Sequence, residues 1–360
     1  MTNEKKDFRL NQILKKYNYE KKAILGKGGF GNVYLISAKG NEFALKVVEV
    51  ESKKEKSIHN VEIEFSTAKE LKSKYCVKTY IIKKDIIEKI NIYSLVMENA
   101  YYKDLNHFMY YIHKNLCFHL NNSVNTYTQI CNMNFMTIKF FAQQFIKVLD
   151  FLYNHNIIHC DIKAENILLG SLFTIKITDF SLIKKKEKNK NITLNSSTWN
   201  IKGPEYYACK EEVNNENSSK IDIFGFGLIL YYMIFKKHVL NDKNKLDNIS
   251  EIEKKREFVI QQINDSIQNI KNADNELIDD ELKKLIISMI NPDIDKRINL
   301  YDLCKNKWIH KDSDIMKKIE YVNVDDEIKK FKEFQKLKSQ NNYYEKISKR
   351  KRKKFHFKKK

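Results

Sequence analysis

The chain has 360 residues, of which 42% are hydrophobic and 12% aromatic, so it can bury a substantial core and does not have the composition of a disordered chain. The formal net charge is +20, but half of this excess comes from the ten Lys and Arg residues, without any acid, between Lys346 and Lys360. The remaining charge is spread thinly, which favours a solvated surface over nucleic-acid binding.

The six cysteines lack the short paired spacings of zinc sites and secreted disulfide scaffolds, so we expect reduced thiols and an intracellular protein, cytoplasmic and/or nuclear. The first residues are charged and contain no apolar stretch of the kind found in signal peptides. The longest apolar run, 223–235, is too short for a bilayer span and contains two glycines, so no membrane span is expected.

The predicted elements divide the chain into an N-terminal extension (1–18), one domain (19–310) and a C-terminal tail (311–360). Residues 19–98 contain four β-rich runs, at 22–25, 33–37, 43–50 and 90–97, and one amphipathic helix near 58–73. Residues 99–310 are mostly helical, with an apolar stripe at 137–153 and a buried helix at 223–235. These patterns predict an α+β fold with a small β-rich lobe and a larger helical lobe.

Two polar, Asn-rich stretches near 111–134 and 237–250 have no clear periodicity and are interpreted as surface insertions. The tail has helical spacing at first and then becomes purely basic. Its basic end, from Lys346 to Lys360, is compatible with nucleic-acid binding, with contact to an anionic membrane surface, or with a nuclear import signal.

A glycine-rich loop lies between the first two predicted strands, and its backbone amides could close over phosphate groups where a Cβ atom would collide. Its residues are Gly26, Lys27, Gly28, Gly29, Phe30 and Gly31, followed by Val33. Such a loop alone is a weak signal, because glycine-rich hairpins have many structural uses. Lys46 ends a strand of apolar residues, and Glu64 on the following helix is its expected partner, whereas Glu62 should face away.

The segment HCDIKAEN, residues 159–166, places an Asp and an Asn five positions apart, and Asp179 follows thirteen positions later. Phosphoryl transfer needs a carboxylate to orient the attacking hydroxyl, a lysine near the transferred phosphate, and an amide and a second carboxylate for magnesium. Asp161, Lys163, Asn166 and Asp179 could supply these groups in turn. Each of them alone is more often a cap or turn residue, so it is their order that indicates a phosphotransferase.

Together these residues resemble the signature set of the protein kinase family, in order, over roughly residues 19–310. Gly203, Pro204 and Glu205 resemble the motif that ends the activation segment of that family, with Thr198 seven residues before Glu205. Three more positions match the family pattern downstream: Asp222, Gly227 and Arg297. The resemblance implies the bilobal kinase fold.

By this resemblance, Lys46 held by Glu64 would contact the α- and β-phosphates of ATP, and Asp161 would accept the proton of the substrate hydroxyl. Lys163 would lie against the γ-phosphate, while Asn166 and Asp179 would bind Mg²⁺. The nucleotide would be bound by the glycine loop (Gly26, Lys27, Gly28, Gly29, Phe30, Gly31) and by Val33, Ala44, Lys46, Met97, Glu98, Ala100, Leu168 and Asp179. Lys163 together with Thr198 is typical of serine/threonine kinases, which act on protein substrates.

The sequence departs from the family pattern at several positions. Cys160 replaces the usual arginine before the catalytic Asp, so loop phosphorylation need not be the activating event; a small buried filler is the expected role of this cysteine. Ser181 replaces a glycine, which adds a Cβ and restricts positive φ. Asp104 and Glu165 stand where basophilic relatives meet substrate arginines, although capping or ribose binding fits them equally.

Three alternatives stay open. A pseudokinase scaffold is suggested by Cys160 and Ser181 but not by the intact Lys46 and Asp161. A small-molecule phosphotransferase shares the Asp-to-Asn spacing but would lack the downstream matches. Nucleic-acid binding through the basic tail could coexist with catalysis.

Overall fold

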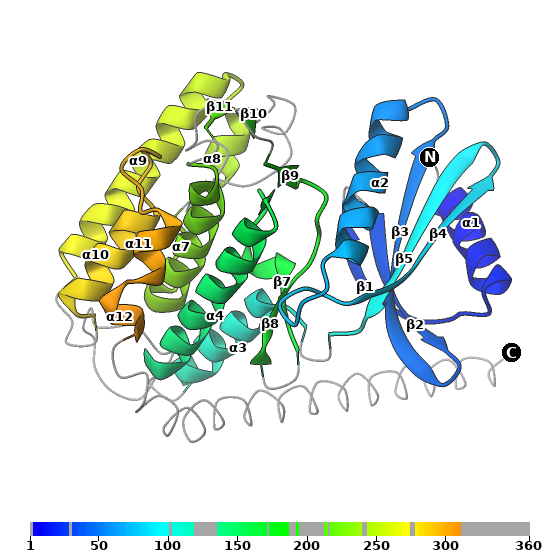
Figure 1. The fold of residues 1–360 in the computed structure, drawn as a ribbon, viewed down its shortest axis with the longest axis horizontal. Helices are drawn as coiled ribbons and strands as arrows, with labels where there is room; N and C mark the ends of the chain where they lie inside the picture. Colours follow the sequence, from blue (N-terminus) through cyan, green and yellow to red (C-terminus); the bar gives the residue numbers. More distant parts are fainter. Residues whose placement is uncertain are drawn as a thin grey trace, which may run out of the picture.

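The computed structural model describes residues 3–28, 31–100, 103–118, 135–170, 173–186, 192–193, 212–214, 217–239, 243–273 and 278–310. These residues form a small lobe built on an antiparallel sheet and a larger lobe built of helices (Figure 1). The predicted α+β, two-lobed architecture is therefore confirmed.

The sheet of the small lobe has the strand order β1-β2-β3-β5-β4. Its strands are β1 (Glu20–Gly28), β2 (Gly31–Ala38), β3 (Asn41–Glu51), β4 (Thr79–Ile87) and β5 (Ile90–Glu98). Two hairpins turn on residue pairs with positive φ, Lys39-Gly40 and Glu88-Lys89, the geometry that matches the twist of paired strands. The four predicted strands are present, but β4 was missed because it is a largely exposed edge strand whose lysines interrupt its apolar run.

Helices cover both faces of this sheet. The predicted helix is α2 (Glu55–Glu70), and a helix that was not predicted, α1 (Asn3–Lys16), packs on the opposite face (Figure 1). Burial on both faces explains why β5 is buried over almost its whole length. Most of the predicted N-terminal extension, 1–18, is therefore helical and in contact with the sheet.

The large lobe is organised around α7 (Ser219–Phe235), which is buried on nearly all sides, as its apolar sequence predicts. The other helices are α3 (Leu105–Phe118), α4 (Phe135–Asn154), α8 (Lys243–Asn248), α9 (Ile252–Lys271), α10 (Asp280–Met289), α11 (Leu300–Cys304) and α12 (Lys307–His310). Phe145 of α4 stacks on Phe226 of α7 with ring centroids 4.4 Å apart. The predicted stripe at 137–153 is therefore the face by which α4 packs on α7.

The large lobe also contains short paired strands. They are β6 (Ile157–Ile158) with β9 (Lys184–Lys185), β7 (Ile167–Leu169) with β8 (Ile175–Ile177), and β10 (Ile192–Thr193) with β11 (Glu212–Val213). The 3₁₀ turn η1 (Ala164–Asn166) precedes β7. The pairs β6–β9 and β7–β8 flank the segment 159–166 and Asp179, which belong to the candidate site.

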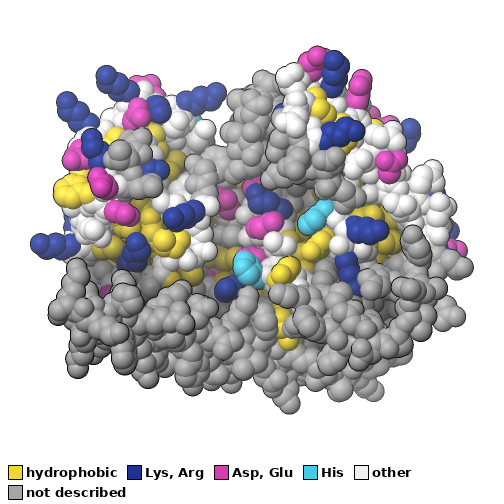
Figure 2. All heavy atoms as spheres, turned by 180° about the vertical axis from the view of Figure 1, so that it is seen from behind, with side chains coloured by type: hydrophobic (Ala, Val, Ile, Leu, Met, Phe, Trp, Pro, Cys, Tyr) yellow, Lys and Arg dark blue, Asp and Glu magenta, His cyan; other side chains and the backbone are white. Residues whose placement is uncertain are grey.

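Part of each predicted insertion is helical, because α3 continues to Phe118 and α8 lies within 237–250. Residues 119–134 and 240–242 and the whole tail, 311–360, lie outside the described residues, so the insertions and the tail stay predictions. None of the described helices combines the length and apolar character that a membrane span requires. On the face shown in Figure 2, basic and acidic side chains of the described residues are interspersed, as expected for a solvated surface.

Candidate active site

A cavity of about 660 Å³ opens between the two lobes. Fourteen of the residues predicted for the site line it: Gly26, Lys27, Gly31, Val33, Ala44, Lys46, Glu64, Met97, Glu98, Ala100, Lys163, Asn166, Leu168 and Asp179. Gly28 ends β1, and Gly29 and Phe30 lie outside the described residues, so their predicted contact with the nucleotide stays a prediction. Asp161 is buried behind the lining, 1% exposed, and contacts it through Lys163 and Asn166.

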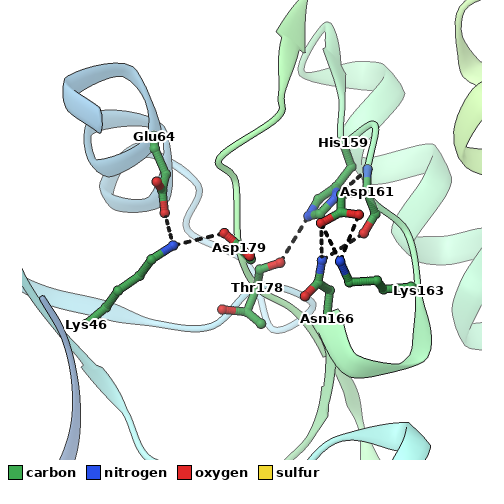
Figure 3. Close-up of polar contacts among 8 residues, drawn as sticks. All are labelled: Lys46, Glu64, His159, Asp161, Lys163, Asn166, Thr178 and Asp179. Carbon is green, nitrogen blue, oxygen red and sulfur yellow. Dashed lines mark hydrogen bonds and ion pairs between the residues drawn. The ribbon is translucent and has the colours of Figure 1, made fainter. Parts of the chain in front are cut away.

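Lys46 lies in the middle of β3, only 7% exposed, and bridges two carboxylates. Its ammonium contacts Glu64 of α2 and donates to Oδ1 of Asp179 at 2.9 Å (Figure 3). Burial alone would lower the pKa of Lys46, but Glu64 and Asp179 outweigh it and raise this pKa above its ordinary value. The lysine therefore stays charged. Glu62 faces away, as predicted, and binds Lys84 instead.

The segment 159–166 holds its polar groups around Asp161. Lys163 Nζ donates to both carboxylate oxygens of Asp161, at 2.9 and 2.8 Å, and Asn166 Nδ2 donates to Oδ2 at 2.9 Å. Asn166 also donates to the backbone oxygen of Asp161 at 2.9 Å. These donors fix the orientation of the carboxylate, and Figure 3 shows the amide oxygen of Asn166 turned toward the side of Asp179.

The backbone of this loop is held by Asp222 at the start of α7. Cys160 has a φ of 60°, which a non-glycine residue rarely adopts. The carboxylate of Asp222 accepts from the amides of His159 and Cys160, at 2.8 and 2.9 Å, and stabilises this conformation. Cys160 is 1% exposed, which fits a buried filler. A Cβ on Gly225 would lie 2.6 Å from Ile162 O, so this glycine lets α7 approach the loop.

The segment Asp179-Phe180-Ser181 turns at its first residue rather than its last. Asp179 has a φ of 65°, whereas Ser181 is not among the residues with positive φ. The serine at the usual glycine position therefore fits this conformation without backbone strain. Phe180 is 3% exposed and packs beside His159, with ring centroids 5.4 Å apart. The buried Oγ of Ser181 has no hydrogen-bond partner among the described residues.

Several lining residues were not predicted for the cavity. They are Ile24, Leu25, Ala68, Val77, Thr79, Leu95, Asn99, Lys103, His107, Thr178 and Phe180. Leu25 could have been found, because it directly precedes the first glycine of the loop. Val77 could not, because it lies on the connection before β4 and reaches the cavity only through the fold.

Asp104 and Glu165, whose roles were left open, both line the cavity but differ in their contacts. Asp104 Oδ1 accepts from the backbone amide of His107 at 2.9 Å, which caps the first turn of α3. The ring Nδ1 of His107 lies 2.7 Å from Asp104 Oδ2. Glu165 is exposed, and its Oε1 accepts a long hydrogen bond from Asn106 Nδ2 at 3.4 Å.

The structure does not describe the predicted end of the activation segment. Thr198, Gly203, Pro204 and Glu205 lie outside the described residues. Arg297, 2% exposed, donates to the backbone oxygens of Asn291 and Lys220, at 2.8 Å each, and its guanidinium lies over the ring of Phe224. This arginine thus anchors the loop before α11 to the start of α7.

The donor set fits a nucleotide bound with Mg²⁺. A carboxylate and an amide oxygen, from Asp179 and Asn166, are ligands that Mg²⁺ accepts together with phosphate oxygens. Lys46 adds a buried positive charge beside Asp179 for the phosphates. The apolar side chains of Val33, Ala44 and Leu168 line the same cavity, as an aromatic base requires.

Comparison with known proteins agrees with this geometry. The family described as protein kinase domain matches residues 19–309. A developmentally regulated protein kinase of Dictyostelium discoideum is 26% identical over 79% of this chain and 35% of its own length. An Aurora kinase of Eremothecium gossypii is 26% identical over 83% of this chain and 71% of its own. A mimivirus protein that carries a serine/threonine-protein kinase name is 26% identical over 61% of this chain and 50% of its own. The chain spans only about a third to a half of the first two curated relatives it matches.

Proposed function

Because this chain belongs to the protein kinase family, we propose that it transfers the γ-phosphoryl group of ATP to serine or threonine hydroxyls of protein substrates, with Mg²⁺. One observation carries the proposal: Lys46 is paired with Glu64 and Asp179 on one side of the cavity, and Asp161 is held by Lys163 and Asn166 on the other. Serine/threonine specificity is further supported by Lys163, two residues after Asp161, and by the name of the mimivirus relative.

In the proposed reaction the hydroxyl oxygen of the substrate forms a bond to the γ-phosphorus while the bond from that phosphorus to the β,γ-bridging oxygen breaks, leaving ADP. Asp161 accepts the hydroxyl proton, and its donors Lys163 and Asn166 hold its oxygens in place. Lys46 orients the α- and β-phosphates. Asp179 and Asn166 would hold Mg²⁺, which neutralises charge on the phosphate oxygens when bound.

The test is incubation of purified full chain with radiolabelled ATP, Mg²⁺ and a generic basic protein, beside Lys46→Met and Asp161→Asn. Both variants should lose label, with Asp161→Asn lowering kcat by about 10²- to 10⁴-fold. Glu64→Gln should also lower activity, whereas Glu62→Gln is the matched control on the same helix and should not. Equal label in wild type, Lys46→Met and Asp161→Asn would contradict the proposal and favour a pseudokinase.

For the substrate we propose a preference for basic residues near the target hydroxyl, recognised by Glu165 rather than Asp104. The carboxylate of Asp104 is occupied by the cap of α3 and by His107, whereas Glu165 is exposed. Peptides with and without an arginine before the serine should differ in kcat/KM for wild type. This difference should shrink in Glu165→Gln and persist in Asp104→Asn; loss only in Asp104→Asn would reverse the assignment.

The basic end of the tail is proposed to bind a polyanion or to direct nuclear import. Deletion of residues 346–360 should weaken salt-dependent binding to nucleic acid or change localisation, while phosphotransfer by the domain is retained. If neither binding nor localisation changes, the segment has neither role.

A further inference from the structure

Helix α1 lies outside the residues that match the kinase family, 19–309, yet it packs on one face of the sheet of the small lobe (Figure 1). Leu10, Ile13 and Leu14 of this helix are 3%, 0% and 8% exposed. They pack into an apolar cluster with these residues of the sheet: Tyr34, Ile36, Leu45, Val47, Ile90, Ile92 and Val96. This cluster is separate from the main core, which lies on the α2 side of the sheet.

Polar contacts fix the helix at its centre and at its end. Arg9, 2% exposed, contacts Glu49 of β3 with Nη2 at 2.6 Å and Nε at 3.2 Å, and Glu88 in the turn between β4 and β5 with Nη1 at 3.3 Å. Tyr17, just after α1, donates to the Asp85 carboxylate of β4 at 2.9 Å. The helix therefore connects β3 to the β4–β5 hairpin across the sheet.

The strand held in this way is the one that carries Lys46. Successive side chains of a strand alternate between faces, so Leu45 and Val47 pack under α1 while Lys46 points to the cavity. Leu45 and Val47 are 0% and 7% exposed. Arg9 contacts the same strand three positions after Lys46. Helix α1 thus packs on the face of β3 opposite to Lys46.

We propose that α1 is a positioning element of the catalytic unit, which holds β3 so that Lys46 meets the nucleotide, with Arg9 as its key residue. This proposal rests on the function proposed above only for its effect on ATP. The catalytic unit accordingly begins at α1 rather than at residue 19. A helix that merely shields apolar surface would stabilise the fold without changing the strand that carries Lys46.

The test uses point variants of the full chain, because deleting α1 would expose an apolar face and favour association. Arg9→Met keeps the apolar stem but removes the fork that joins Glu49 and Glu88, and Arg9→Lys keeps the charge. Lys6→Met, at an exposed position of the same helix, is the matched control. Tyr17→Phe is a milder variant that removes one hydroxyl, in case Arg9→Met does not fold.

Amide exchange is measured at a temperature where circular dichroism shows the variants folded. In residues 44–48 the exchange rate should rise about tenfold in Arg9→Met, rise by a smaller factor in Arg9→Lys and stay at the wild-type rate in Lys6→Met. KM for ATP should rise by about fivefold or more while kcat changes less. If Arg9→Met does not fold, faster exchange in residues 44–48 of Tyr17→Phe would support the proposal, and unchanged exchange there would overturn it.

A lower melting temperature with unchanged β3 exchange and unchanged KM would overturn the proposal. Wild type could show no phosphotransfer while amide exchange in residues 44–48 still becomes faster in Arg9→Met. That result would support the positioning of β3 by α1 and contradict only the proposed function.

Discussion

Single residues with no role in the chemistry shape the site. Asp222 accepts two backbone amides from residues more than sixty positions earlier in the chain, and one of these amides belongs to Cys160, whose φ is positive. The turn that presents Asp161 thus depends on a carboxylate that is itself 2% exposed. An unusual backbone conformation persists only where surrounding groups determine it this strongly.

We predict that Asp222→Asn lowers kcat and destabilises the fold by about 1 to 3 kcal/mol, because the amide replaces one acceptor with a donor that faces another N–H group. Urea unfolding and phosphotransfer assays measure the two effects. Asp150→Asn, at an exposed position of α4, is the control and should leave both unchanged. Full activity of Asp222→Asn would mean that the turn does not need this carboxylate.

Cys76 provides a pH-dependent prediction. Burial raises the pKa of this thiol from an ordinary value of 9.0 to about 12. The folded state therefore holds the proton more tightly, and the resulting stability is complete below pH 9 and lost as the pH rises toward 12. Between pH 7 and pH 10 the free energy of unfolding should fall by about 1 kcal/mol more in wild type than in Cys76→Ala, as measured by urea unfolding. An identical pH dependence in both proteins would contradict this.

At the level of elements, the connection between α2 and β4 joins the two lobes. The backbone amide of Val77 donates to Ile177 O of β8 at 3.0 Å, and the Ile177 amide donates to Tyr75 O at 2.8 Å. Glu98, at the end of β5, reinforces this junction: it accepts from Lys176 of β8 at 2.7 Å and from the Lys78 amide at 2.6 Å. The back of the cavity is therefore held from both lobes.

We predict that Lys176→Met raises KM for ATP by about fivefold with a smaller change in kcat, because the half-buried ion pair sets the distance between the lobes where the base would bind. Steady-state kinetics measure both constants. Lys254→Met is the control, since its pair with Glu251 is exposed on α9 and remote from the cavity. Equal KM values in all three proteins would exclude this role for the pair.

For the whole molecule, one core continues from the α2 face of the sheet into the large lobe, and a second, smaller core lies under α1. The cavity interrupts the contact between the lobes, and its polar groups come from both. A ligand that contacts both lobes should therefore stabilise the folded protein as a unit.

Mg²⁺ and ATP at about 100 times the dissociation constant should stabilise the protein by about 2.7 kcal/mol, which corresponds to a rise of about 5 °C or more in Tm. Thermal unfolding with and without nucleotide measures this shift. Lys46→Met should lose most of it, because the variant lacks the charge that faces the phosphates. An equal shift in wild type and Lys46→Met would indicate that the nucleotide binds elsewhere.

Local patterns predicted most of the elements that position the site. Short β-rich runs predicted four of the five strands of the small lobe, three- and four-residue spacing predicted α2 and α4, and a continuous apolar run predicted α7. The spacing also distinguished Glu64 from Glu62 correctly. The two elements that were not predicted, α1 and β4, have a common feature. Both carry many charged residues, which obscure their apolar pattern in the sequence, and both are stabilised by contact with the other strands of the sheet.

The sequence by itself determined which chemical groups the candidate site holds, because the glycine loop, Lys46, Asp161, Asn166 and Asp179 are recognisable from residue type and order. Only the tertiary structure decided how these groups are supported. Three contacts give this support: Arg9 of α1 with Glu49 of β3, the carboxylate of Asp222 with the amide of Cys160, and Glu98 with Lys176. They join residues between 40 and 78 positions apart. Contacts of that range leave no local periodicity, since they depend on packing that forms only when the chain folds.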